Sequence, residues 1–307
     1  MTKFKRLVTA MVVVLVAVGL LIIGSGSHQA RNTKPIRVAA SLNFYGEAAR
    51  QVAGQYGQVT TFINNAAVDP HDYQPGTKEA RQVSAANVVI VNGLGYDDWL
   101  SKIAMADDKE GALINVAASV AHKKAGANEH VWYRPQTMVD LTSKLAHRYS
   151  RIDPSHRQYY FRRAHLYQRH LQLISREINA CQRRVNHHDN RVDVTEPVFD
   201  YALASLGYRV NNPHFAKAVE DGNDPSPKDI RQMQADIIHH RIAFLVVNTQ
   251  ETDGTIDNMV KLAQKHRVPL MKVTEAEPAH QDYVQWMTKQ YRELAKIQQS
   301  KEELSSH

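Results

Sequence analysis

Short apolar runs recur along the first half of the chain, separated by stretches whose apolar residues are spaced like one face of a helix. The runs are continuous, which is typical of strands covered on both faces. Strands that alternate with helices indicate parallel βαβ units. We expect strands at residues 36–42, 59–64, 88–92 and 113–117, and helices at residues 45–56, 77–86 and 97–106.

The second half of the chain repeats this alternation. It predicts strands at 191–195, 242–247 and 270–273, and helices at 197–206, 258–266 and 281–299. The fold class is therefore α/β, with two similar lobes that are each a mostly parallel sheet flanked by helices, joined by one long rigid helix. The expected boundaries are 35–152 for the N-terminal lobe, 153–186 for the connecting helix and 190–301 for the C-terminal lobe.

The expected connecting helix carries one apolar stripe. Its members recur at alternating steps of four and three residues: Tyr160, Ala164, Tyr167, Leu171, Ile174, Ile178, Cys181 and Val185. Asp153 followed by Pro154 is a favourable start for a helix, with an N-cap and an N1 proline. About 30 residues at about 1.5 Å each predict a helix close to 45 Å long. The spacing also fits a coiled coil, but the α/β segments on both sides favour a connector laid against the two lobes.

The first thirty residues differ from the rest of the chain. Lys3, Lys5 and Arg6 precede an apolar run at residues 8–23, which is the layout of a secretory signal or a membrane anchor. The positive residues place the N-terminus in the cytoplasm and the remainder outside. A buried core helix is the alternative. We expect residues 1–30 to tether the chain to the extracytoplasmic face of the membrane, or to release it as a secreted protein if they are cleaved.

Cysteine and charge exclude several classes of protein. The single cysteine, Cys181, cannot form an intramolecular disulfide, and no lipid-attachment cysteine follows the apolar run. The formal net charge is +7, with 38 Lys and Arg residues scattered along the chain. Four arginines share the expected connecting helix: Arg157, Arg162, Arg163 and Arg169. For an exported chain, a solvated helix face is a better explanation of these arginines than a nucleic-acid partner.

Four polar segments place histidine or carboxylate side chains near expected strand ends or in loops. They are DPHDYQP at 69–75, NEHVWYRP at 128–135, VTEP at 194–197 and VTEAEP at 273–278. Ligands of open parallel sheets bind beyond the carboxyl ends of the strands, so these segments are the candidates for a binding site.

Two of these segments give the chain a specific resemblance. DPHDYQP and EHVWYRP are similar to the two histidine motifs of the metal-binding ABC-transporter solute-binding proteins, the cluster that carries zinc and manganese. The Asn92-Gly93-Leu94 and Trp99-Leu100 segments also resemble that family. The likeness runs from about residue 36 to the C-terminal helix, and the long connecting helix is itself a feature of the family.

The resemblance implies four metal ligands, two from each lobe: His71, His130, Glu196 and Glu275. The family usually has proline before the second histidine, where this chain has Glu129. It more often has Asp where this chain has Glu275, and Glu277 two residues later is an alternative fourth ligand. No residue is implied to be catalytic, and no cofactor is implied other than the transported ion, Mn²⁺ or Zn²⁺.

The ligand types agree with that implication on chemical grounds. Two neutral imidazoles and two carboxylates neutralise a divalent cation, and a site without thiolate suits Mn²⁺, Zn²⁺ or Fe²⁺. Bidentate carboxylates raise the coordination number and favour manganese, although intrinsic affinity rises from Mn²⁺ toward Zn²⁺. The stretch before His130 lacks the histidine- and acid-rich loop of many zinc members, so we favour manganese over zinc.

Each candidate also has an ordinary structural explanation. His71 could be a turn residue beside Pro70, His130 a surface loop residue, Glu196 a residue favouring a helix N-terminus and Glu275 a solvated acid. Three aromatic residues could either wall the site or pack in the core: Tyr73, Trp132 and Tyr133.

The resulting prediction is an extracytoplasmic substrate-binding component of an ABC importer. It would capture the ion in the cleft between the lobes as a monomer and deliver it to a membrane permease and its ATPase. The alternatives are a zinc-specific importer component, a surface adhesin, a binder of a larger metal chelate and a metal-dependent hydrolase. No H-E-x-x-H or G-x-S-x-G motif is present, and four protein ligands close a site to catalytic water, so we do not expect an enzyme.

Overall fold

Two parallel sheets of four strands each organise the computed structural model, which describes residues 34–251 and 253–305. The first lobe has the strand order β2-β1-β3-β4. Its strands are β1 (Ile36–Leu42), β2 (Gly57–Ile63), β3 (Val88–Val91) and β4 (Leu113–Asn115). All three pairings are parallel, as the continuous apolar runs predict.

The second lobe repeats this topology with the order β6-β5-β7-β8. Its strands are β5 (Arg191–Val194), β6 (Arg209–Val210), β7 (Leu245–Asn248) and β8 (Leu270–Val273), again all parallel. In each lobe the strand order reverses between the first and third strands in sequence, and ligands of open α/β sheets bind at such reversals. The α/β fold class with two similar lobes is therefore confirmed.

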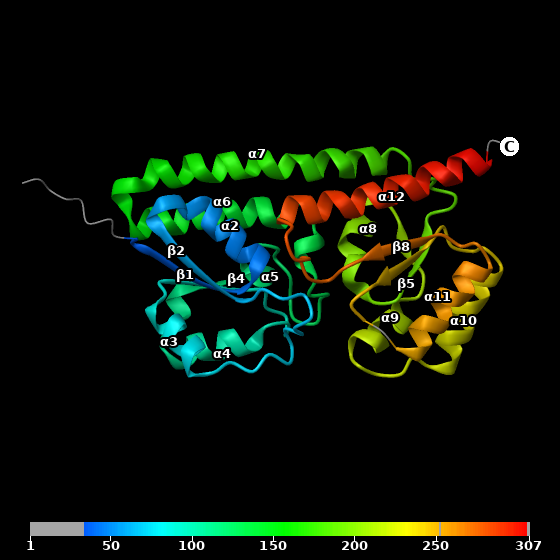
Figure 1. The fold of residues 1–307 in the computed structure, drawn as a ribbon, viewed down its shortest axis with the longest axis horizontal. Helices are drawn as coiled ribbons and strands as arrows, with labels where there is room; N and C mark the ends of the chain where they lie inside the picture. The colour runs from blue at the N-terminus through cyan, green and yellow to red at the C-terminus, as the bar shows by residue number, and fades with distance from the viewer. Residues whose placement is uncertain (1–33, 252, 306–307) are drawn as a thin grey trace, which may run out of the picture. The chain divides into compact units, whose positions relative to one another are not determined.

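Helices flank the sheets of both lobes (Figure 1). The first lobe contains α2 (Asn43–Ala53), α3 (Thr77–Ala85), α4 (Asp98–Ala106), α5 (Val116–Ser119) and α6 (Thr137–Ile152). The second contains α8 (Asp200–Leu206), α9 (Pro213–Glu220), α10 (Pro227–Ile238), α11 (Gly254–Lys265) and α12 (Tyr283–Ser305). Short 3-10 turns join several of them, including η3 (Val131–Tyr133) and η5 (Pro197–Phe199).

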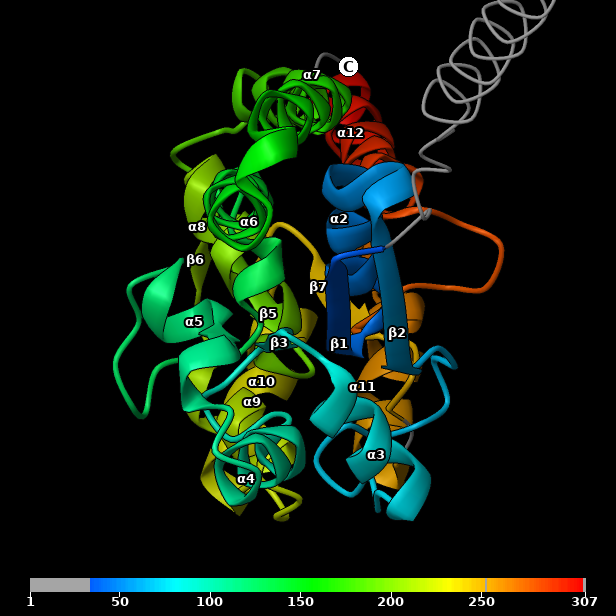
Figure 2. The same cartoon turned by 90° about the vertical axis from the view of Figure 1, so that its left-hand side faces the viewer.

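The long helix α7 (Arg157–Gln182) joins the two lobes and packs on α2 and α6 of the first lobe and on α8 and α12 (Figures 1 and 2). It has 26 residues, about 39 Å at about 1.5 Å each, so it is shorter than predicted. The predicted first turn is the separate 3-10 turn Pro154–His156. The predicted stripe is buried throughout, from Tyr160 to Val185, and it faces helices of the same chain, which explains the spacing without a coiled coil.

Among the described residues, no helix combines the length and apolar character needed to cross a bilayer. The expected signal or anchor at residues 1–30 lies outside the described residues, and it stays a prediction.

Asp193 is a buried carboxyl group within β5 of the second lobe. Its residue is fully buried, and its neighbour Asp236 comes from α10. The Asn211 amide donates to both groups, at 3.3 Å to Asp193 Oδ1 and 2.9 Å to Asp236 Oδ2. Burial and the nearby Asp236 raise the pKa of Asp193 to about 7. The Asn211 hydrogen bond and Arg191 oppose this rise but do not cancel it.

We expect Asp193 to make the fold less stable as the pH rises from about 4 to 7. Its folded-state pKa exceeds the unfolded value of about 3.9, so its contribution is complete below about pH 4 and is lost as the pH passes the folded value. About three pKa units correspond to at most about 4 kcal/mol. In urea unfolding with EDTA present, Asp193→Asn should flatten this pH dependence. Exposed Asp224→Asn is the control, and an unchanged pH dependence in Asp193→Asn would contradict the assignment.

Candidate metal centre

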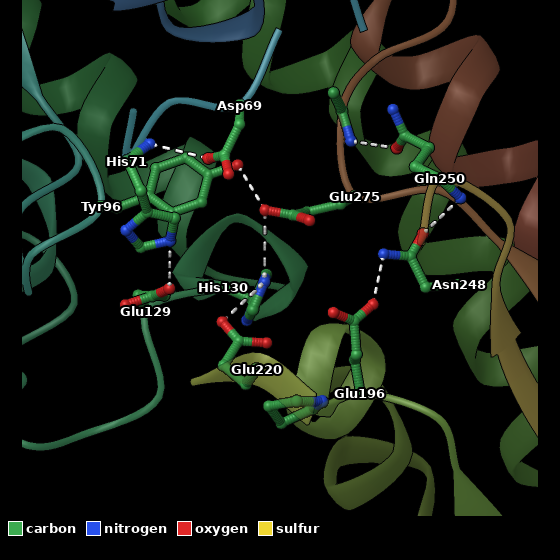
Figure 3. A network of polar contacts seen from close by, with 12 residues as sticks. Asp69, His71, Tyr96, Glu129, His130, Glu196, Glu220, Asn248, Gln250 and Glu275 are labelled. Atoms are coloured by element: carbon green, nitrogen blue, oxygen red, sulfur yellow. Dashed lines mark hydrogen bonds and ion pairs between the residues drawn. The ribbon is translucent and has the colours of Figure 1, made fainter. Parts of the chain in front are cut away.

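A polar cavity of about 270 Å³ lies beyond the carboxyl ends of strands from both lobes. Three of the four predicted ligands line it: His71 from the first lobe, and Glu196 and Glu275 from the second. Tyr96 and Glu220 also line it. The fourth predicted ligand, His130, is buried beside them and faces two of these carboxylates (Figure 3).

His71 lies in the loop between β2 and α3. The Asp69 carboxylate accepts a hydrogen bond from the His71 backbone N–H at 2.8 Å, which shapes the turn. The His71 side chain is 41% exposed, and its Nε2 lies 2.9 Å from Glu129 Oε1. The bond to Glu129 raises the pKa of His71 to about 9, although burial opposes the rise.

His130 is fully buried, so the alternative of a surface loop residue is wrong. The Asn128 Oδ1 atom accepts hydrogen bonds from the His130 backbone N–H at 2.8 Å and from Nδ1 at 2.9 Å. The Asn128 amide nitrogen donates to the Pro197 carbonyl at 2.6 Å, so its oxygen must face the imidazole. With its proton on Nδ1, neutral His130 presents the lone pair of Nε2 toward the cavity side.

The His130 Nε2 atom has no hydrogen-bond partner among the described residues. Two carboxylate oxygens lie beyond hydrogen-bonding distance from it, Glu275 Oε1 at 3.6 Å and Glu220 Oε1 at 3.8 Å. Burial lowers the pKa of His130, but Glu275, Glu220 and Glu129 outweigh it and raise the pKa to about 9. A positive charge between this nitrogen and these oxygens is therefore favoured, and a divalent cation would supply it.

Glu275 lies just after β8, and one residue, Thr274, separates it from the end of the strand. The Tyr96 hydroxyl donates to its Oε1 at 2.7 Å. Gly93, with φ of 85°, turns the loop after β3 and thereby brings Tyr96 back toward the cavity. Burial raises the pKa of Glu275, but His130 and the Tyr96 hydrogen bond outweigh it, so the net pKa is lowered.

Glu196 lies at the strand-order reversal of the second lobe. It comes shortly after β5, and Asn248 at the end of the neighbouring β7 donates to its Oε2 at 2.6 Å. Burial raises the pKa of Glu196 to about 7, although the Asn248 bond opposes the rise. A nearby cation would offset the cost of keeping this buried carboxylate ionised.

Glu277 points away from this cavity. It is buried, its Oε1 accepts a hydrogen bond from Asn43 at 3.1 Å, and it does not line the cavity. The geometry therefore favours Glu275 as the candidate fourth ligand.

Two further carboxylates belong to the same cluster. Potential ligand atoms of His71, Glu129 and Glu220 all lie within 4.8 Å of one another. The sequence flagged Glu129 only as a departure from the family motif, and it gave no sign of Glu220. Asn212 and the N1 proline Pro213 could have revealed the start of its helix α9, but they do not mark Glu220 as a ligand.

The three aromatic residues that could have walled the site do not line the cavity. Trp132 and Tyr133 are fully buried in an aromatic core with Phe44 and Trp286, and Trp132 packs on the His130 ring at 5.1 Å between centroids. Tyr73 packs on Trp99 at 4.6 Å. The aromatic side chain of Tyr96, which the sequence did not single out, does line the cavity.

The family model for the periplasmic component A of the zinc-uptake complex matches residues 38–297. The chain belongs to this family. The match therefore confirms the family resemblance that the two histidine segments indicated.

Curated proteins that are similar to this chain are named for manganese and iron. The manganese ABC transporter substrate-binding lipoprotein PsaA of Streptococcus mitis is 19% identical over 279 residues, covering 87% of this chain and 88% of that protein. The manganese-binding lipoprotein MntA of Halalkalibacterium halodurans is 21% identical, covering 64% and 67%. The iron-binding protein YfeA of Yersinia pestis is 20% identical, covering 57% and 58%.

Solved structures share the fold of this family member. The solute-binding protein FpvC of Pseudomonas aeruginosa, solved in complex with Mn²⁺, superposes with a TM-score of 0.70 at 19% identity, covering 87% of this chain and 99% of that one. The periplasmic zinc binding protein TroA of Treponema pallidum gives 0.70 at 13% identity, covering 85% and 98%.

Proposed function

We propose that this chain captures a divalent transition metal, Mn²⁺ in preference to Zn²⁺, through His71, His130, Glu196 and Glu275. The observation that carries the proposal is the buried Nε2 of His130, which faces two carboxylates and has no hydrogen-bond partner in the described part of the chain. The lone pair and the oxygens repel one another unless a proton or a cation lies between them. Membership of the zinc-uptake family and relatives named for manganese support the same conclusion.

The ion would be cargo, delivered to an ABC permease and its ATPase. We place capture on the extracytoplasmic face of the membrane, with residues 1–30 as tether, and treat the chain as a monomer. The domain boundaries 35–152, 153–186 and 190–301 belong to this proposal, because the ligands come in pairs from the first and last of these segments. Binding would draw the lobes together, while packing on α7 would limit the movement to a small hinge.

Carrying the ion fits this centre better than catalysis. A catalytic metal usually keeps three protein ligands and an open position for water. Here His71, Glu196, Glu220 and Glu275 line one cavity, and His130 faces two of its carboxylates, so protein atoms could fill the coordination sphere. We therefore assign no enzymatic role.

His71→Ala tests the proposal on the most exposed of the four residues. The full-length chain, dialysed against metal-replete and then metal-free buffer, should retain one manganese or zinc ion per chain by elemental analysis. Because the variant removes one ligand of several, its affinity in competition with a chelator should fall about tenfold to a hundredfold. His122→Ala, a loop histidine that does not line the cavity, is the control. If His71→Ala retained metal as tightly as the parent, the assignment would fail.

A further inference from the structure

Glu220 occupies an unfavourable position unless a cation lies beside it. It is the last residue of α9, where the helix dipole disfavours negative charge. Its side chain is only 15% exposed, and Glu129 lies in the same cluster. Burial and Glu129 raise the pKa of Glu220, and His130 opposes them. Residues that break a local rule in this way are expected at functional sites.

Glu220 also connects the two halves of the cluster. On one side its carboxylate lies within 4.8 Å of ligand atoms of His71 and Glu129. On the other side its Oε1 lies 3.8 Å from the buried Nε2 of His130 (Figure 3). Two atoms bound to one ion at about 2.2 Å can be separated by at most about 4.4 Å. The observed separations are close to this limit, so small side-chain movements suffice for a shared ion.

The cluster is therefore more than a group of acids. A separate observation, the buried side chain of His130, indicates that an ion binds here. Its Nε2 has no hydrogen-bond partner among the described residues and faces Glu220 and Glu275. Asn128 holds the opposite nitrogen of the ring, so Nε2 cannot turn away to another partner.

We propose that Glu220 is a further ligand of the captured ion and that it sets the preference for Mn²⁺ over Zn²⁺. The inference rests on the proposed function and deepens it. Zn²⁺ is satisfied by four ligands, whereas hard ions such as Mn²⁺ favour oxygen-rich, six-coordinate sites. A third second-lobe carboxylate, added to Glu196 and Glu275, raises both the coordination number and the share of oxygen. It thereby favours manganese against the intrinsic trend toward zinc.

The test compares Glu220→Gln with the parent, in the full-length chain, for Mn²⁺ and Zn²⁺ separately by chelator competition. Glutamine keeps the size of the side chain and removes its charge. We expect Mn²⁺ affinity to fall about tenfold or more and Zn²⁺ affinity to fall less than about threefold. Glu251→Gln removes an exposed carboxylate from the rim of the same cavity and should change neither value.

A second variant separates ligation from charge. Glu220→Asp retains the carboxylate but shortens its reach, so a ligand role predicts a loss of Mn²⁺ affinity similar to that of Glu220→Gln. The Mn²⁺ electron paramagnetic resonance spectrum of each loaded protein should also differ from that of the parent. Circular dichroism of each variant confirms that the fold is retained.

The outcomes separate this inference from the proposed function. Parent protein that retains Mn²⁺, with Glu220→Gln indistinguishable from Glu251→Gln, would overturn the inference alone. Full Mn²⁺ affinity in Glu220→Asp would also overturn the inference, because it would show that Glu220 acts through its charge and does not bind the ion. Parent protein that retains neither ion would overturn both.

Discussion

Replacing Glu196 and Glu275 together with glutamine is expected to abolish metal retention by the full-length chain. Both residues are carboxylates of the second lobe that line the cavity, and Glu275 Oε1 lies 3.6 Å from His130 Nε2. Without them the second lobe keeps Glu220 and the exposed rim carboxylate Glu251 at this cavity. We expect affinity to fall at least about a thousandfold, which is about 4 kcal/mol, and elemental analysis after dialysis to find little metal.

The double glutamine variant should fold normally, because its amides can still accept the hydrogen bonds from Asn248 and Tyr96. The matched control is Glu251→Gln with Glu277→Gln, which removes two carboxylates at the rim of the cavity or outside it. Metal loss in the control double variant, rather than in Glu196→Gln with Glu275→Gln, would relocate the centre toward Glu277.

Saturating Mn²⁺ is expected to raise the melting temperature of the parent protein strongly. A ligand at a thousand times its dissociation constant stabilises the native state by about 4 kcal/mol. For a chain of this size that corresponds to a shift of roughly 8–16 °C. Calorimetry or circular dichroism with EDTA and with excess Mn²⁺ measures it directly.

Two controls show whether the temperature shift comes from this site. The Glu196→Gln, Glu275→Gln variant should melt at the same temperature with EDTA and with Mn²⁺. Mg²⁺, which takes oxygen ligands and dehydrates reluctantly, should shift the parent far less. Equal Mn²⁺ shifts in parent and variant would show that the ion binds elsewhere.

The sequence predicted the buried strands well, because both faces of these sheets are covered. Residues 36–42 and 270–273 form strands with the predicted bounds, as β1 and β8. The strand expected at 242–247 begins later, as β7 (Leu245–Asn248). The preceding Ile242 and Phe244 are buried outside the strand, so hydrophobicity alone could not mark its start.

The sequence was less informative about some of the helices. Helices α6 and α9 were not predicted, although Asn212, followed by the N1 proline Pro213, marks the start of α9. Glu220 was missed for this reason. Resemblance identified four candidate ligands, whose assignment stays a prediction. It could not reveal that Glu129 and Glu220 join them, since contacts between segments 90 residues apart are set by tertiary packing.

The hydrogen bonds of Asn128 have a consequence for how fast an ion can leave. This one amide holds the His130 ring and, through the Pro197 carbonyl, the loop that carries Glu196, while Tyr201 of the second lobe donates to the Asn128 carbonyl at 2.7 Å. Separating the lobes would break the two bonds that cross between them and leave the Asn128 amide without the contacts that fix its orientation. The hold on the His130 ring is thereby tied to the approach of the two lobes, so opening them would loosen the ion's imidazole ligand as well as withdraw its carboxylates.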